Sequence, residues 1–273
     1  MAAKYRKSRK SGPGAQKIFD THAHVSARAF DRDRQQVLER ARDLGIVFME
    51  VGYDEESSRK SVALAEKIGG FCAVGIHPHY ARGDDDLEAR WAYLEDLVTG
   101  SPRVKAIGEI GLDYFRNLSP KRDQMDAFVM GLDLARRHGL PVIIHQRDSA
   151  RDVVSILEQH GRDIPLVFHC FSEDIDYARR CLDLGGYIGL GGPLTYPRNG
   201  YLRDMLKFLP QDRLLAETDC PWLPPQSKRG KRNEPAYIVE VIQTMAEVLR
   251  QSPNQISRLT LDNAVRVFAI GEE

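Results

Sequence analysis

Short apolar runs alternate with longer amphipathic stretches along the chain from residue 18 onward. The runs lie at residues 18–21, 46–51, 71–76, 104–107, 141–144, 166–168, 187–190 and 214–216. Brief, continuously apolar runs are typical of strands that are buried on both faces. Between two of them, residues 119–138 place apolar side chains at helical spacing, with Ser119-Pro120 at the start and Gly139 just past the end. The pattern therefore predicts eight strands that alternate with helices.

Eight buried strands that alternate with helices indicate parallel pairing, because parallel strands need long crossover connections. A (β/α)8 TIM barrel of about 250 residues fits the length of the chain, which has 273 residues. A doubly wound open sheet is the alternative α/β arrangement. We predict one barrel domain over residues 18–273. Residues 1–17 carry six basic and no acidic side chains, a composition that predicts a disordered basic tail.

The overall charge limits the kind of partner that the chain can bind. The 39 basic residues balance the 39 acidic ones, so the chain lacks the broad basic excess of a protein that coats duplex nucleic acid. A local basic cleft is still compatible with this balance. The four cysteines lack paired CxxC spacing, and no apolar run approaches the roughly 20 residues that span a bilayer. We therefore expect a cytoplasmic protein without a membrane partner, and we find no signal for an obligate protein partner.

Metal-binding side chains recur at the predicted strand ends, where the chemistry of such barrels gathers. The candidate ligands are His22, His24, Glu109, His145, His169 and Asp219. Four imidazoles and two carboxylates exceed the needs of one tetrahedral site. The set therefore predicts two divalent ions, with Glu109, midway in the strand order, as the bridge. Magnesium, manganese and zinc all remain open as the metal.

The chain resembles the TatD family of metal-dependent deoxyribonucleases, which belong to the amidohydrolase-like TIM barrels. The matching segments, in family order, are FDTHAHV, GIHPH, GEIGLDYFRN, PVIIHQRD, HCFS, ETDCPWLPP, RNEP and DNAVRVF. The resemblance implies a hydrolase of phosphodiester bonds in DNA, with an exonuclease as the first choice. It places one ion on His22, His24, Glu109 and Asp219 and the other on Glu109, His145 and His169. It also places His77 at the scissile phosphate.

Further residues at the strand ends are candidates for roles in catalysis and substrate binding. Asp219 is the predicted acceptor of the proton of the attacking water, with Glu217 next in order. His77, His79 and Arg147 are candidate contacts to the substrate, although Arg147 fits a salt bridge at the barrel rim equally well. Tyr114, Phe115 and Phe171 are candidates for stacking on the bases of single-stranded DNA.

The segment after the predicted eighth strand, residues 227–235, has two candidate roles. Asn233 or Glu234 is expected to cap the last barrel helix, and the basic loop SKRGKR before them is a weaker candidate for a nucleic-acid contact.

Besides a nuclease, two other functions stay open, because a metal centre of this kind also activates water against other bonds. The alternative substrates are the ester of D-aminoacyl-tRNA and a small amide or lactone. A metal-loaded scaffold without turnover is the third possibility.

Overall fold

The eight predicted strands form one parallel sheet that curves into a barrel. In the computed structural model, which describes residues 17–82 and 86–271, the strands pair in chain order from β1 to β8. A doubly wound sheet reverses its strand order part-way, so the order seen here confirms the predicted (β/α)8 TIM barrel. Residues 1–16 of the predicted tail lie outside the described residues, and the tail stays a prediction. Within the described ranges, no helix has the length and apolar character needed to cross a membrane.

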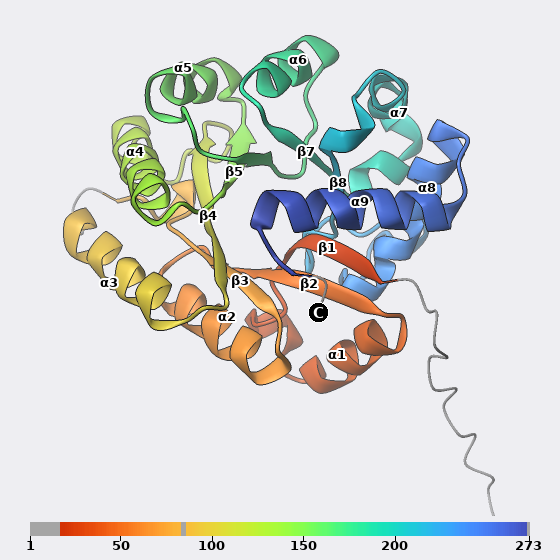
Figure 1. Cartoon of the computed structure of the whole chain (residues 1–273), viewed down its shortest axis with the longest axis horizontal. Helices are drawn as coiled ribbons and strands as arrows, with labels where there is room; N and C mark the ends of the chain where they lie inside the picture. The colour runs from red at the N-terminus through yellow and green to blue at the C-terminus, as the bar shows by residue number, and fades with distance from the viewer. Residues whose placement is uncertain (1–16, 83–85, 272–273) are drawn as a thin grey trace, which may run out of the picture.

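Helices surround the barrel, as Figure 1 shows. The strands are β1 (Ile18–Ala23), β2 (Ile46–Val51), β3 (Phe71–Val74), β4 (Val104–Asp113), β5 (Val142–Arg147), β6 (Leu166–Phe168), β7 (Tyr187–Leu190) and β8 (Leu214–Ala216). The α-helices of the described residues are α1 (Arg34–Asp43), α2 (Glu55–Ile68), α3 (Leu87–Gly100), α4 (Lys121–His138), α5 (Ala150–His160), α6 (Ile175–Asp183), α7 (Gly200–Leu206), α8 (Ile238–Leu249) and α9 (Pro253–Phe268). The predicted helix over residues 119–138 is α4, and its end at the left-handed Gly139 is confirmed.

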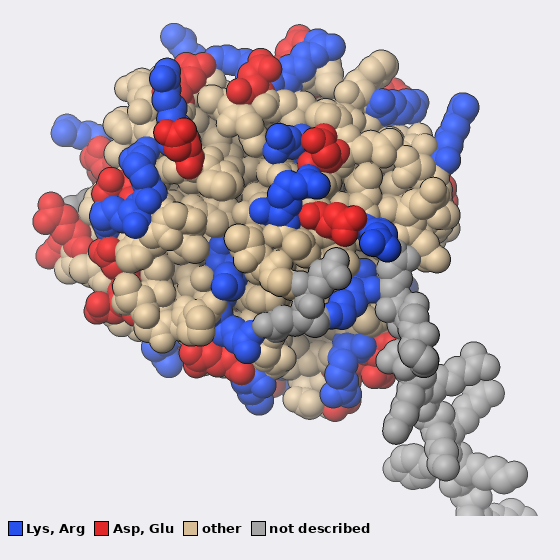
Figure 2. Space-filling view, in the orientation of Figure 1, with Lys and Arg blue, Asp and Glu red and all other residues tan. Residues whose placement is uncertain are grey.

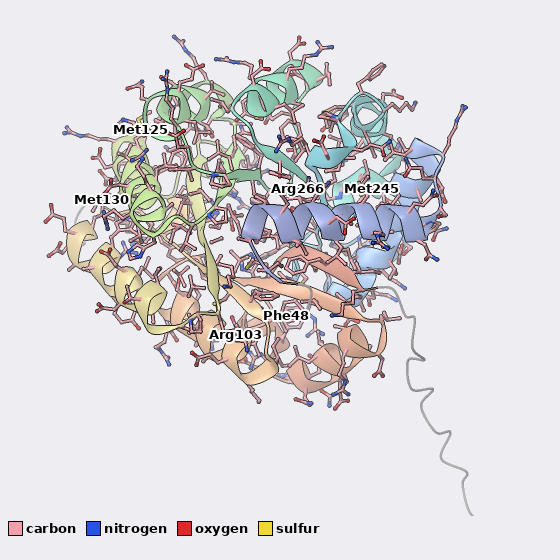
Figure 3. The ribbon with its side chains drawn as sticks, viewed as in Figure 1. Phe48, Arg103, Met125, Met130, Met245 and Arg266 are labelled. Atoms are coloured by element: carbon pink, nitrogen blue, oxygen red, sulfur yellow. The ribbon has the colours of Figure 1, made fainter. Side chains whose placement is uncertain are left out.

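Two apolar layers hold the barrel together, because successive side chains of a strand point to opposite faces of the sheet. One layer fills the space between the strands and the outer helices and includes Met245 of α8, with Met125 and Met130 of α4 packed against it (Figure 3). The other includes Phe19 and Phe71 from the starts of β1 and β3, together with Phe268 of α9. Helix α9 lies across this end of the barrel (Figure 1), so the opposite end, where the strands finish, remains for a site.

Acidic and basic side chains are interspersed on the face that carries α9 (Figure 2). This face therefore lacks the single-sign field that would attract duplex nucleic acid by bulk electrostatics. The observation agrees with the balanced charge of the sequence.

Strands β4 and β5 are longer than the sequence predicts. Their pairing continues through Gly111 with His145 and through Asp113 with Arg147, so Glu109 and His145 lie inside strands and not after them. Gly111 has a φ of +139°, and a Cβ atom there would lie 2.0 Å from the carbonyl oxygen of His145. Only glycine permits this close passage, which brings the chain around Glu109 against the strand that carries His145.

The segment after β8 returns to the start of the barrel. An isolated parallel bridge joins Ala23 to Cys220, and the buried carboxylate of Asp20 accepts hydrogen bonds from the backbone N–H of Thr218 at 2.9 Å and from its hydroxyl at 2.6 Å. A side chain of β1 thus fastens the chain just beyond β8. This seam lies directly below the residues that form the site.

The expectation that Asn233 or Glu234 caps the last barrel helix is wrong. Asn233 instead donates from Nδ2 to the carbonyl oxygens of Thr218 and Trp222. The carboxylate of Glu234 receives two hydrogen bonds from Arg40 of α1, at 2.7 and 2.6 Å. Both side chains are committed to tertiary contacts, so neither is available to the first turn of α8.

Candidate metal centre

His22 near the end of β1, His24 just past it and an aspartate that follows β8 converge at the C-terminal end of the barrel. The Nε2 atoms of His22 and His24 lie 3.0 Å apart, because residues i and i+2 of a strand share a face. The Oδ1 atom of Asp219 lies 3.6 Å from Nε2 of His24 and 4.0 Å from Nε2 of His22. Asp219 reaches this position from a left-handed backbone conformation with φ 56°. Its N–H donates to the carbonyl oxygen of His22 at 2.8 Å, which fixes the carboxylate beside both imidazoles.

A second group of histidines lies on the other side of Glu109. The Oε1 atom of Glu109 lies 2.6 Å from Nδ1 of His145 and 2.7 Å from Nε2 of His169. Its Oε2 atom lies 3.3 Å from Nε2 of His22 and 3.9 Å from Nε2 of His24. One carboxylate therefore presents a different oxygen to each group of imidazoles, and all six predicted ligands meet around it.

The outward contacts of His24 and His145 indicate which nitrogen of each ring faces the centre as an acceptor. Nδ1 of His24 lies 2.7 Å from the carbonyl oxygen of Val51, and Nε2 of His145 lies 3.1 Å from the carboxylate of Asp113. Oxygens of these kinds accept a hydrogen bond, so each outward nitrogen carries the proton and the inward nitrogen of a neutral ring has a free lone pair. This arrangement is the one that a metal-ligating histidine requires.

His77 has the opposite arrangement. The backbone N–H of His79 donates to Nδ1 of His77 at 3.0 Å, so the proton of the neutral ring lies on Nε2. That Nε2 atom points to the centre, 3.5 Å from Oε1 of Glu109. Burial lowers the pKa of His77 to about 4, which keeps the ring neutral near pH 7. His77 therefore presents a hydrogen-bond donor to the centre, and a donor suits a phosphate oxygen better than a cation.

The carboxylates of the centre remain ionised despite their burial. Burial by itself raises the pKa of Glu109, but the neighbouring His169 and His77 lower it well below its ordinary value. Burial likewise opposes the ionisation of Asp219, but the neighbouring His24, His22 and His169 together outweigh it, so that its pKa is lowered. Anionic oxygens and imidazole lone pairs that face one another are the donor set of a divalent cation. The chemistry of these residues thus fits a metal centre.

Comparison with known proteins agrees with this geometry. The family model described as "TatD related DNase" matches residues 19–269. The chain belongs to the TatD DNase family. It is 38% identical to an uncharacterized metal-dependent hydrolase, YabD, of Bacillus subtilis, over 93% of this chain and 99% of the relative. It is 36% identical to the 3'-5' ssDNA/RNA exonuclease TatD of Rahnella, over 93% of this chain and 98% of that protein.

A solved structure of a TatD relative has the same fold. The TatD homologue YJJV of Escherichia coli superposes with a TM-score of 0.87 at 30% identity, over 94% of this chain and 100% of the other. An organophosphorus hydrolase of Deinococcus radiodurans shares the fold alone, with a TM-score of 0.64 at 16% identity. Both the predicted family and the predicted class, a metal-dependent hydrolase, are confirmed.

Two further acids lie beside the candidate ligands: Asp113, which the sequence did not single out, and Glu217, which the sequence indicated only as a second candidate base. The carboxylate of Asp113 lies against both His145 and His79. Glu217, the second candidate for the base, accepts a hydrogen bond from the N–H of Cys170 at 2.5 Å and lies 3.5 Å from Nδ1 of His169. Glu217 thus lies beside His169 and His22 as a further acid that could hold a metal ion. An acid inside or beside an apolar run was the available signal, since a buried carboxylate needs partners.

An open cleft with a volume of about 750 Å³ leads to the candidate metal centre. Its lining includes Arg116, Arg147 and Arg198 together with the aromatic residues Tyr53, Tyr80, Tyr196, Tyr201 and Trp222. His79 also lines the cleft, although its Nε2 atom is already bonded to Asp113 at 2.8 Å. The predicted contacts of Arg147 and His79 with substrate stay predictions.

The aromatic residues predicted for base stacking differ from those that line the cleft. Phe171 is 5% exposed and stacks on Tyr177 with ring centroids 5.8 Å apart, so its assignment to base stacking is corrected. The hydroxyl of Tyr114 donates to Asp152 at 2.8 Å. The exposed ring of Phe115 lies under the guanidinium of Arg147, whose carbon is 3.8 Å from the ring centroid. Sequence position placed these residues near the rim but did not show which way their rings face.

Proposed function

We propose that the chain is a TatD-type exonuclease that cleaves phosphodiester bonds of single-stranded DNA with two divalent ions. The observation that carries this proposal is the position of Glu109, whose two oxygens face two separate groups of imidazoles. In this proposal His22, His24, Glu109 and Asp219 hold one ion, and Glu109, His145 and His169 hold the other. The activity named for relatives such as the Rahnella exonuclease supports the choice of substrate.

The protein's own groups suit hydrolysis of a phosphodiester. Two ions held by these residues would lower the pKa of a water molecule and stabilise the charge that develops on the phosphoryl oxygens. Asp219 accepts the proton of the attacking water, because its lowered pKa keeps it in the basic form at neutral pH. His77 donates from Nε2 to a phosphate oxygen. Both groups face the centre from strand ends, so the barrel holds them in place before substrate arrives.

A direct test compares labelled substrates side by side, with the protein loaded with magnesium, manganese or zinc. We expect release of nucleotides from single-stranded oligonucleotides, inhibition by a block at the 3′ end only, and a lack of hydrolysis of D-aminoacyl-tRNA. These results would show degradation from the 3′ end. Release that depends on a free 5′ end would instead show degradation from the 5′ end. Hydrolysis of the aminoacyl ester without cleavage of DNA would refute the proposed nuclease and favour the ester hydrolase.

The variant Asp219→Asn tests the proposed proton acceptor. Asparagine keeps one coordinating oxygen but does not take up the proton, so cleavage should fall by about 10² to 10⁴-fold while the ion at His145 and His169 is retained. Metal analysis of the same samples is the control. Full metal content with near wild-type turnover would move the base to another residue. Turnover that persists in Glu109→Ala, with the fold retained, would contradict the metal mechanism as a whole.

A further inference from the structure

A large aromatic side chain lies exposed beside the metal ligands. Trp222 is 50% exposed and lines the cleft. Its ring meets that of His24 edge to face, with centroids 5.1 Å apart and planes inclined by 73°. An indole ring packed entirely into the core would be ordinary. An indole that leaves half its surface open, next to a residue that faces the centre, offers an apolar face to whatever binds there.

The position of Trp222 is fixed by its own backbone. Its N–H donates to the carbonyl oxygen of Asp219 at 3.0 Å. Its carbonyl oxygen accepts a hydrogen bond at 2.7 Å from Nδ2 of Asn233, which is fully buried and also bonds to Thr218. The backbone of Trp222 is therefore held three residues after the proposed proton acceptor, and its indole packs edge to face on the buried His24. An aromatic face that is fixed in advance loses little conformational entropy when a planar group stacks on it.

His24 has a second aromatic neighbour, Tyr53. The ring centroid of Tyr53 lies 5.7 Å from that of His24, and Tyr53 stacks on Tyr80 with centroids 5.5 Å apart. Arg116 and Arg198 line the same cleft. Open aromatic faces combined with cations are the usual means of binding single-stranded nucleic acid, because every base has a π-face and every nucleotide a phosphate. Duplex DNA, with its bases stacked inside, would leave these faces unused.

We propose that Trp222 stacks on the base of one of the two nucleosides that flank the scissile phosphate. This inference rests on the proposed function and adds a base-binding subsite to it. The stacking requires a base but no particular one, so it selects unpaired strand ends without selecting sequence. Because the indole contacts His24 edge to face, a base stacked on the indole would lie next to the centre.

The test combines a variant with a substrate that lacks one base. Wild-type protein, Trp222→Ala, Trp222→Phe and the control Phe208→Ala, whose ring is 75% exposed outside the cleft, are compared in single-turnover cleavage. The substrates are an intact oligonucleotide and two matched oligonucleotides that are abasic at the terminal or at the penultimate nucleotide. On intact DNA we expect kcat/KM of Trp222→Ala to fall about 5- to 150-fold, with Trp222→Phe close to wild type and Phe208→Ala unchanged.

On one of the two abasic substrates, wild type and Trp222→Ala should cleave at rates within about twofold of each other, since the stacking partner is gone. An equal loss on all three substrates, or a parallel loss of bound metal, would show that Trp222 acts through His24 and would overturn the assignment. An unchanged rate in Trp222→Ala would overturn it as well. Wild-type protein that leaves every substrate uncut would instead refute the proposed function, and the subsite with it.

Discussion

The Oδ2 atom of Asp113 lies 3.1 Å from Nε2 of His145 and so orients the ring whose other nitrogen faces Glu109. Asp113 is fully anionic in this position. Burial opposes its ionisation, but the hydrogen bonds with His145 and His79 lower its pKa below the ordinary value. The carboxylate thereby raises the basicity of His145 as a ligand and fixes its tautomer.

Replacement of Asp113 by asparagine should therefore weaken metal binding without unfolding the barrel. We expect the affinity for the ion at His145 and His169 to fall by about 10- to 100-fold, because the ring loses its charged partner. Metal titration followed by calorimetry measures the change. The exposed carboxylate of Asp96 on α3 provides the matched control Asp96→Asn, which should bind metal as wild type does. Equal affinities in Asp113→Asn and wild type would show that Asp113 does not support the ligand.

His77→Ala should separate metal binding from catalysis. In the proposed function His77 is a donor to the centre and not a ligand, because the N–H of His79 donates to its Nδ1 atom and leaves the proton on Nε2. We expect metal content to stay near that of wild type while nucleolysis falls by about 10² to 10³-fold, the usual loss when one donor to a developing charge is removed. Plasma emission spectrometry and a cleavage assay on the same sample give both values. If metal and activity disappear together, His77 is a ligand.

The layer beneath the site should contribute to stability without contributing to chemistry. Phe268 is 1% exposed and stacks on Phe19 with centroids 6.2 Å apart. We expect Phe268→Ala to lower the free energy of unfolding by about 3 to 5 kcal/mol, because it leaves a cavity where α9 covers the barrel. Urea denaturation measures the loss, and metal stoichiometry at low temperature should not change. The exposed Phe208→Ala should differ from wild type by less than about 0.5 kcal/mol.

Acid should weaken the contact between Asp33 and Arg232. The guanidinium of Arg232 hydrogen bonds to both oxygens of Asp33 at 2.7 Å and lowers the pKa of that carboxylate. A carboxylate whose pKa is lowered by folding stabilises the protein above its unfolded pKa and loses this contribution as the pH falls through the folded value. Wild type should therefore exceed Arg232→Met in unfolding free energy at neutral pH, and the difference should shrink below about pH 4. A difference that is constant with pH would assign the effect to packing.

The fold and the convergence of the candidate ligands could be predicted from the sequence for related reasons. Buried parallel strands are recognisable as short apolar runs, and a polar residue such as His22 or His169 at the end of a run is conspicuous. Glu109 lies beside the other candidate ligands, as expected, but inside its strand and not after it, because the pairing of β4 with β5 continues through polar residues. The local pattern does not report that pairing, which depends on the neighbouring strand.

The aromatic residues and the supporting acids show where such prediction stops. Phe171 and Trp222 both follow predicted ligands by a few positions, and only the structure shows that one ring is buried and the other open. Asp113 was part of a matching motif, but its partners, His79 and His145, come from two other parts of the chain. The direction of a side chain and the partners of a buried charge are set by tertiary packing, which spacing along the chain does not encode.

A metal ion in the proposed centre would also stabilise the junction between β1 and the segment that follows β8. His22 and His24 stand on one side of it and Asp219 on the other, while the hydrogen bonds of Asp20 to Thr218 and the single bridge from Ala23 to Cys220 hold the two edges together. An ion bound by all three would cross-link the first strand to the segment that follows the last one and so stabilise the closed barrel. If the proposed ion is bound there, chelation should accordingly speed amide hydrogen exchange at this junction before it affects the opposite wall of the barrel, because the same ion would also stabilise the contact between the first and last strands.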